Sequence, residues 1–403
     1  MRMKKEEIIK KFAKSVFDEY KRKNAVTISN ISSTLIEAAL NSAFVNESCK
    51  STEKISKSQI IYRKLDLNIS EIEFAFRENA KRFLNLLKIF SRNRRFILSF
   101  DETEDPFYGK FNKAEDNLYL HDLTYVEKGA KYCYKYLTLA ITCNNGIRYI
   151  LDGIILKRGD YVEDYVYEMT KAVKKQIKIE CVLFDRGFGW GVIYKLKELN
   201  VNYMVFWKKQ GGWYKPYFKK MKDGEFCTIH KNYKYNRNKT NYKVDSNFIL
   251  VKQFEYKGKK FDWIFATNLK LRSARKYVMW YKKRWGIETI FRITDDIRIY
   301  TTSTNPLIRY FLFMFTCFVY NVWKFFQFFM GEEFTLANFS TNMSMFMIEK
   351  EMIKPKYYRQ FLLIFSRYNN LCAKVRWNYI KNSFSIDFKK TLRKMIEILF
   401  YMV

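Results

Sequence analysis

The hydrophobic pattern of the chain changes near residue 95, and this change constrains the fold more than any other feature. Upstream, apolar residues recur every three or four positions, as they do at 8–20, which is typical of amphipathic helices. Downstream, short apolar runs typical of strands begin with FILSFD at 96–101. The pattern therefore predicts a helical domain at 1–95 and an α/β domain at 96–330.

The N-terminal region contains signals for several short helices. We expect helices at 32–45 and 57–65, and a longer one that ends near residue 90 and begins after Asn68 and Ser70, whose side-chain oxygens suit an N-cap. Short helices in a basic segment favour a DNA-binding module, and a helical cap on the next domain is the alternative. Helical patterns also dominate 331–403, which we expect to form a C-terminal helical region.

Strands and helices alternate in the first part of the α/β domain. Strand-like runs at 136–143 and 147–156 are joined by Asn144-Asn145-Gly146, a hairpin signal because Asn and Gly tolerate positive φ. The remaining expected elements are a helix at 162–175, a strand at 180–185, a helix at 191–199 and a strand at 201–207. This order predicts a mixed sheet flanked by helices.

A basic, β-rich insertion is expected at 208–267, where aromatic and β-branched residues alternate with lysines. The whole chain has a formal net charge of +33, and residues 201–284 carry 22 Lys plus Arg against five acids, a local net charge of +17. Lysines interleaved with aromatic rings suit a surface that follows phosphates and stacks on bases. A solvated, lysine-rich sheet is the alternative.

Composition excludes several classes of site. The seven cysteines form no C-x-x-C pair, and their odd number does not suggest a disulfide framework, so a reducing cytoplasm fits. Only His121 and His230 occur, which rules out a three-histidine zinc site. The apolar run at 310–320 is about 11 residues long, which favours a buried core helix over a membrane span.

Three carboxylates stand out as candidates for chemistry. Asp101 closes the strand-like run FILSFD and Asp185 closes CVLFD, so both could project into the crevice at the strand ends of an open sheet. Glu288 shares one helix face with Tyr281 and Arg284, at offsets of three and four residues. The alternatives are strand-end turns for the aspartates and an i, i+4 ion pair between Arg284 and Glu288.

Three carboxylates without histidine suit hard cations such as Mg²⁺ or Mn²⁺. Two such ions, roughly 3.5–4 Å apart, can activate a water or a 3′-hydroxyl and stabilise the leaving oxygen of a phosphodiester. Arg284 could neutralise a phosphate, and Tyr281 could bind a phosphate or orient Glu288.

The motifs around these residues resemble the DDE transposases of prokaryotic insertion sequences, in the insertion-sequence-four group with its Y-R-E-K signature. Asp101 begins D-E-T-E-D-P-F-Y-G-K, Asp185 begins D-R-G-F, and Tyr281, Arg284 and Glu288 match Y-x(2)-R-x(3)-E. One departure is that Asp295 stands where the family has its lysine. Arg292 or Arg298 could replace that lysine in contacting DNA phosphate, or the copy is impaired.

The resemblance implies an RNase H-like core that cleaves double-stranded DNA at the terminal repeats of an element and transfers the freed 3′-hydroxyl to target DNA. It implies two Mg²⁺ or Mn²⁺ ions, a homodimer and a location in the cytoplasm with the nucleoid, with no membrane partner. Four tryptophans are candidates for stacking on an unstacked base: Trp207, Trp213, Trp263 and Trp285. An RNase H-like nuclease without strand transfer and a binding-only, transposase-derived protein are the alternatives.

Overall fold

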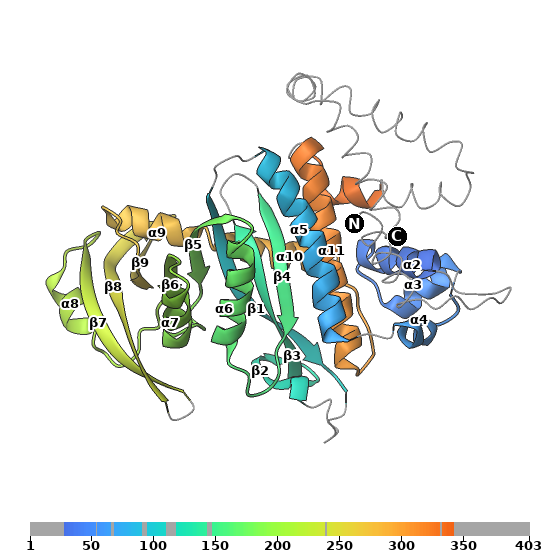
Figure 1. Ribbon diagram of the computed structural model, residues 1–403, viewed down its shortest axis with the longest axis horizontal. Coiled ribbons are helices and arrows are strands. Elements are labelled where there is room, and N and C mark those ends of the chain that lie inside the picture. Colours follow the sequence, from blue (N-terminus) through green and yellow to red (C-terminus); the bar gives the residue numbers. More distant parts are fainter. Residues whose placement is uncertain are drawn as a thin grey trace, which may run out of the picture. The chain divides into compact units, whose positions relative to one another are not determined.

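The computed structural model describes residues 28–341, apart from 54, 66–67, 91–94, 110–117, 143–146, 238–239 and 331–332 (Figure 1). The expected helix at 8–20, the turn at 144–146 and most of the expected C-terminal region lie outside the described residues. The chain divides into two compact units. The larger unit contains Ile69–Ile293 and Thr304–Met314. The other unit contains the described residues up to Asn68, Thr294–Ser303 and the described residues from Phe315 onward.

Three short helices form the N-terminal part of the unit that contains Thr294–Ser303. They are α2 (Ile28–Leu40), α3 (Val45–Thr52) and α4 (Ser58–Lys64). The helix expected at 32–45 ends earlier, because Ser42 has a φ of 48° and a left-handed residue cannot continue a right-handed helix. The helix α3, which the sequence pattern did not predict, begins after this break. Buried Leu35, Val45 and Ile61 contribute to the core of the three helices.

The other unit contains a nine-stranded sheet among the described residues, with the order β2-β3-β1-β5-β6-β9-β8-β7 and β4 paired with β3. Only the β1–β5 and β5–β6 pairs are parallel. The strands are β1 (Arg95–Phe107), β2 (Leu120–Glu127), β3 (Ala130–Thr142), β4 (Arg148–Ile155), β5 (Lys178–Phe184), β6 (Tyr203–Phe206), β7 (Phe226–Arg237), β8 (Thr240–Tyr256) and β9 (Lys259–Thr267). This architecture confirms the predicted mixed sheet.

The helices of this unit lie on both faces of the sheet. They are α5 (Ile69–Phe90), α6 (Val162–Lys174), α7 (Trp190–Glu198), α8 (Lys215–Lys220), α9 (Ala274–Lys282), most of α10 (Trp285–Asp296) and the start of α11 (Pro306–Met330). Tyr281 of α9 packs in one core cluster with Ile97 and Leu183. Phe184, the next residue of β5, faces the other way and contacts Phe188 just before α7.

The expected β-rich insertion is an extension of the central sheet. Its strand β9 pairs antiparallel with β6, with Phe265 opposite Phe206, and β8 and β7 continue outward to the edge of the sheet (Figure 1). The turn between β8 and β9 uses Lys257 and Gly258, both with positive φ. The insertion and the core strands therefore share one backbone hydrogen-bond network.

The apolar helix α11 packs against the sheet through its first turns. Tyr310 Oη donates a hydrogen bond to the Gly153 carbonyl of β4 at 2.7 Å, and the Phe313 ring stacks on Tyr136 of β3 at 4.2 Å. Residues 306–328 are long and apolar enough to cross a membrane by length and composition, yet 61% of the most apolar window is buried inside the protein. This burial agrees with the predicted core helix.

Candidate active site

Two neighbouring parallel strands position the two aspartates. Ser99 of β1 lies opposite Leu183 of β5, and Asp101 and Asp185 each follow two residues later. Because side chains alternate along a strand, both aspartates emerge on the sheet face that α9 covers. The expectation that Asp101 ends its strand was wrong, since β1 continues to Phe107 by pairing with β3 after its parallel pairing with β5 has stopped.

The third carboxylate comes from the helical segment above this face. Tyr281 is the penultimate residue of α9, and Glu288 lies in the first turn of α10. The sequence pattern predicted one helix, and the chain instead makes a short turn at Lys283 and Arg284. Lys283 keeps right-handed helical dihedrals, with φ −61° and ψ −25°, so the three motif residues still share one face.

The Arg284 guanidinium contacts all three carboxylates. Its Nη1 lies 3.6 Å from Asp101 Oδ2, and its Nη2 lies 3.9 Å from Asp185 Oδ2 and forms an ion pair with Glu288 Oε1. The side chain of Arg284 is only 4% exposed, whereas Glu288 is 53% exposed. The predicted i, i+4 pair between Arg284 and Glu288 therefore forms, as part of a larger cluster.

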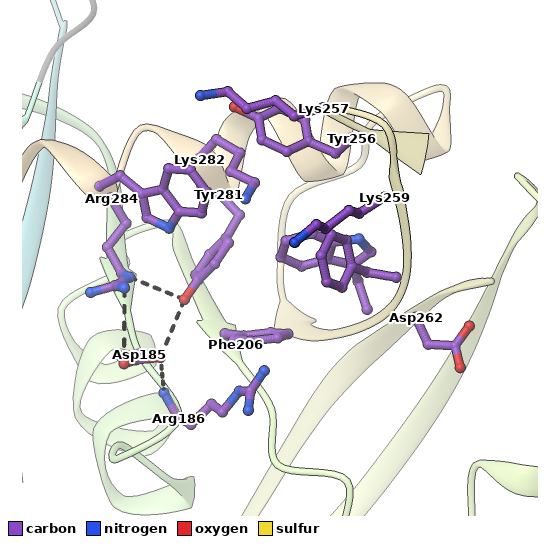
Figure 2. A pocket seen from close by; sticks show the side chains of 13 residues that line it. Asp185, Arg186, Phe206, Tyr256, Lys257, Lys259, Asp262, Tyr281, Lys282 and Arg284 are labelled. Carbon is purple, nitrogen blue, oxygen red and sulfur yellow. Dashed lines mark hydrogen bonds and ion pairs between the residues drawn. The ribbon is translucent and has the colours of Figure 1, made fainter. Parts of the chain in front are cut away.

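Tyr281 connects the arginine to the second aspartate. Its hydroxyl accepts a hydrogen bond from Arg284 Nε at 3.0 Å and donates one to Asp185 Oδ1 at 3.3 Å (Figure 2). Burial raises the pKa of Tyr281, so the hydroxyl keeps its proton and donates to the carboxylate. The sequence predicted that Tyr281 could orient Glu288. In the structure its hydroxyl contacts a different carboxylate, that of Asp185.

The site brings three negative charges together, and Asp101 is the most buried of the three. Burial, together with the charges of Asp185 and Glu288, raises the pKa of Asp101 to about 7, although Arg284 opposes the shift. One buried cation thus compensates three carboxylates only in part. A further cation bound at these oxygens would relieve the repulsion.

The chemical type of the three side chains fits a hard divalent cation. Asp101, Asp185 and Glu288 supply only oxygen atoms, with no imidazole or thiol among them. In the arrangement that the structure shows, no three carboxylate, imidazole or thiol groups of the described residues are close enough to hold one metal ion. Arg284 lies among the carboxylates and separates Glu288 from the two aspartates.

The other predicted phosphate-binding residues lie farther along the chain. Arg292 is exposed on α10, one turn after Glu288. Arg298 lies beyond the end of α10, where Nη1 is 3.9 Å from Asp295 Oδ1. Asp295, which the sequence resemblance predicts to stand in place of a lysine, is itself 66% exposed.

The four tryptophans fall into different environments. Trp207 and Trp213 are half-buried and pack edge-on against Phe248. Trp263 is 6% exposed within the core cluster under α9, and Trp285 is 38% exposed. Their stacking on DNA bases stays a prediction, and of the four Trp285 is the most accessible.

A pocket of about 620 Å³ opens beside Asp185, between the β8–β9 turn and the end of α9 (Figure 2). Trp263 and Trp285 lie in its wall, with the basic residues Arg186, Lys257 and Lys259. Sequence reasoning did not single out these three basic residues. The pocket belongs to the same site as the three carboxylates, because Asp185, Tyr281 and Arg284 also line it.

Lys282, which sequence reasoning also missed, lies among the rings of this pocket. Its Nζ is 3.2 Å from the centroid of Trp285 and 4.1 Å from that of Tyr256. Burial lowers the pKa of Lys282 to about 8. The run of basic residues at 282–284 inside the Y-x(2)-R-x(3)-E motif was the available signal for it.

Comparison with known proteins identifies the family. Residues 100–322 match the family described as Transposase DDE domain, and the match spans more than half of the chain. The chain belongs to this family. The matched DDE domain contains Asp101, Asp185 and Glu288, and the family generally uses divalent metal ions. No curated protein sequence matches the chain.

One solved structure supports the fold of the DDE domain. The piggyBac transposase, in a synaptic complex with hairpin DNA, is similar over 84% of this chain and 75% of that chain, with 13% identity and a TM-score of 0.50. This likeness supports the predicted RNase H-like fold. Two Mos1 transposase structures, a paired-end complex with the left transposon end and a strand transfer complex, match 50% and 46% of this chain with TM-scores of 0.19 and 0.18. They share 13% and 12% identity over 62% and 59% of those chains.

Proposed function

We propose that this protein is a DNA transposase of the insertion-sequence-four group, in its Y-R-E-K branch. It binds the terminal repeats of its element, cleaves the phosphodiester bonds there and transfers the freed 3′-hydroxyl to target DNA. The observation that carries the proposal is the convergence of Asp101, Asp185 and Glu288, from three separate elements, on the buried Arg284 within a transposase DDE domain.

Asp101, Asp185 and Glu288 are the proposed ligands for two Mg²⁺ or Mn²⁺ ions. When bound, such ions activate the attacking water or 3′-hydroxyl and stabilise the leaving oxygen. Glu288 must leave Arg284 to join the aspartates, which frees the planar guanidinium for a phosphate oxygen. Tyr281 holds Asp185 in place while Glu288 moves, because its hydroxyl bonds Asp185 rather than Glu288.

The pocket beside Asp185 supports DNA as the substrate. Lys257, Lys259 and Arg186 offer positive charge for the backbone of a strand, and Trp285 offers an accessible ring. Arg292 is the better placed substitute for the family's lysine, because it is exposed and Arg298 is paired with Asp295. The protein is also proposed to act as a homodimer that brings two transposon ends together, in the cytoplasm with the nucleoid.

The test is Mg²⁺-dependent nicking and joining of a DNA duplex that carries the terminal sequences flanking this gene. The proposal expects both activities from the wild-type protein and neither from Glu288→Gln. Nicking without joining would replace the transposase by an RNase H-like nuclease. Binding without nicking in both proteins would establish the binding-only function, which the departure at Asp295 favours.

A further inference from the structure

The edge of the sheet carries an exposed polar surface that the catalytic site does not use. We call it the ribbon face, and it consists of five residues on the paired strands β7 and β8: Asn232, Lys234, Asn236, Asn241 and Lys243. All five are exposed, and each is an amide or a cation. β7 is the outermost strand on this side of the sheet, as Figure 1 shows.

The neighbours of these residues show which way the ribbon face points. Tyr233 of β7 stacks on Trp190 of α7, and Arg237 forms an ion pair with Asp164 of α6. Because side chains alternate along a strand, the residues of the ribbon face project from the opposite side of β7. Asp245 lies opposite Asn232 on this same face, and Lys197 of α7 pairs with it at 2.6 Å. The acid is therefore already balanced by a lysine outside the ribbon face and does not cancel the charges of Lys234 and Lys243.

The ribbon face contains a pair of like charges. Lys234 lies directly opposite Lys243, and Asn236 opposite Asn241 is an adjacent pair on the same face. Like charges in direct cross-strand positions destabilise a sheet. Neither lysine has an acidic partner among the described residues. The chain therefore keeps two lysines side by side where folding alone disfavours them, and a polyanion would relieve this repulsion.

We propose that the ribbon face enters the major groove of double-stranded DNA and reads base edges there. The major groove admits a two-stranded β-ribbon, and an asparagine amide can bond an adenine through two hydrogen bonds. From Asn232 to Asn236 the strand advances about 13 Å, roughly the length of four base pairs. The lysine pair would bind the backbone phosphates that flank these bases. The proposal rests on the proposed function for DNA as the ligand.

The first test separates base reading from charge. Equilibrium binding is measured by fluorescence anisotropy, with a duplex of the flanking terminal sequence and a scrambled duplex of the same length. In the double variant Asn236→Ala with Asn241→Ala, the ratio of affinities for the terminal and scrambled duplexes should fall by about tenfold or more. The dependence of its binding constant on salt concentration should not change. Replacing adenines of the terminal duplex by 7-deazaadenine, which removes a major-groove acceptor, should weaken wild-type binding and leave this variant unaffected.

The second test uses the lysine pair. Lys243→Glu creates an ion pair with Lys234, so it should raise the melting temperature of the free protein and weaken its DNA binding by tenfold or more. A merely structural role would not give these opposite changes. The control is Lys175→Gln with Lys178→Gln, two exposed lysines between the end of α6 and the start of β5, which should keep the full preference for the terminal duplex.

The outcomes distinguish this inference from the proposed function. If the Asn236→Ala, Asn241→Ala variant keeps the wild-type preference, the ribbon face does not read bases and the inference fails, whatever the cleavage assay shows. If the wild-type protein shows no preference between the duplexes, the inference also fails. Mg²⁺-dependent nicking by that same protein would still support the catalytic proposal.

Discussion

At the scale of the residue, Arg284 determines the charge balance of the site. Its side chain is almost fully buried and contacts three carboxylates that come from β1, the end of β5 and α10. A buried charge that loses its partners is strongly destabilising, so the carboxylates and the arginine stabilise one another in the free protein. The same groups must exchange partners when a divalent cation binds.

We predict that Asp101→Asn, Asp185→Asn and Glu288→Gln each abolish cleavage of terminal DNA and leave DNA binding within about twofold of wild type. Each change removes a metal-binding charge and keeps the shape of the side chain. Cleavage is measured on a labelled duplex in Mg²⁺, and binding by anisotropy without divalent ions. Any of the three variants that cleaves at the wild-type rate would remove its residue from the site.

The stability of the metal-free protein should fall as pH rises from about 4 to 7. The pKa of Asp101 is raised from 3.8 to about 7 on folding, so in this window the folded state keeps a proton that the unfolded state has lost. More protons in the folded state mean that the free energy of unfolding decreases with pH, by about 2–4 kcal/mol for this group. Urea unfolding at pH 5 and pH 8 measures it.

Asp101→Asn is the matched control for this pH dependence, because its side chain cannot ionise. The variant should lack most of the decrease that the wild type shows between the two pH values. Mg²⁺ favours the ionised carboxylate, so it should stabilise the wild type more at pH 8 than at pH 5. Equal pH dependence in the two proteins would show that Asp101 is not the group responsible.

At the scale of the element, local patterns predicted the strands and helices that carry the site, and non-local pairing decided the rest. The apolar run CVLF correctly predicted β5, and Asp185, expected as the last residue of that strand, directly follows it. FILSFD suggested a strand that ends at Asp101, but pairing with β3 carries β1 six residues further, and no short-range pattern encodes that partner. The polar strand β2 was missed for the same reason, since its pairing with β3 rather than its composition makes it a strand.

The same limit applies to the candidate site. The Y-x(2)-R-x(3)-E spacing identified Tyr281, Arg284 and Glu288, because helical neighbours are set by local geometry. The contact of Arg284 with Asp101 spans 183 residues of sequence and depends on how α9 packs on the sheet. Lys282 was missed because its pocket is formed by Tyr256 and Trp285 from different elements.

The docking of α11 on β4 should be sensitive to the size of residue 153. A Cβ at Gly153 would lie 2.8 Å from Met314 Sδ, where α11 approaches the strand closely. We predict that Gly153→Val lowers the free energy of unfolding by about 1–3 kcal/mol, because overpacking forces neighbouring side chains to move. Chemical denaturation measures this change. Gly189→Ala is the control, since a Cβ there meets no atom within 4 Å, and an equal loss in both variants would contradict the explanation.

At the scale of the whole molecule, charge should control the strength of DNA binding. Residues 201–284, which include the insertion and the pocket lysines, carry +17 of the formal net charge of +33. We predict that the logarithm of the association constant falls steeply with the logarithm of salt concentration, with a slope of about −5 or steeper, because each neutralised phosphate releases counterions. A titration series between 50 and 300 mM salt measures the slope. A nearly flat response would show that these lysines do not contact the DNA backbone.

The pairing of β9 with β6 has a consequence for how such a protein would choose the bond it cuts. The ribbon at the edge of the sheet and Asp185 at the end of β5 belong to one continuous sheet, in which only β6, β9 and β8 lie between β5 and β7. A sheet held by backbone hydrogen bonds keeps a fixed distance between these two places. The bond that is cut would then lie a fixed number of base pairs from the sequence that the ribbon face recognises. Inserting about five base pairs, half a turn of the double helix, between them should move the cut with the recognised sequence or abolish it.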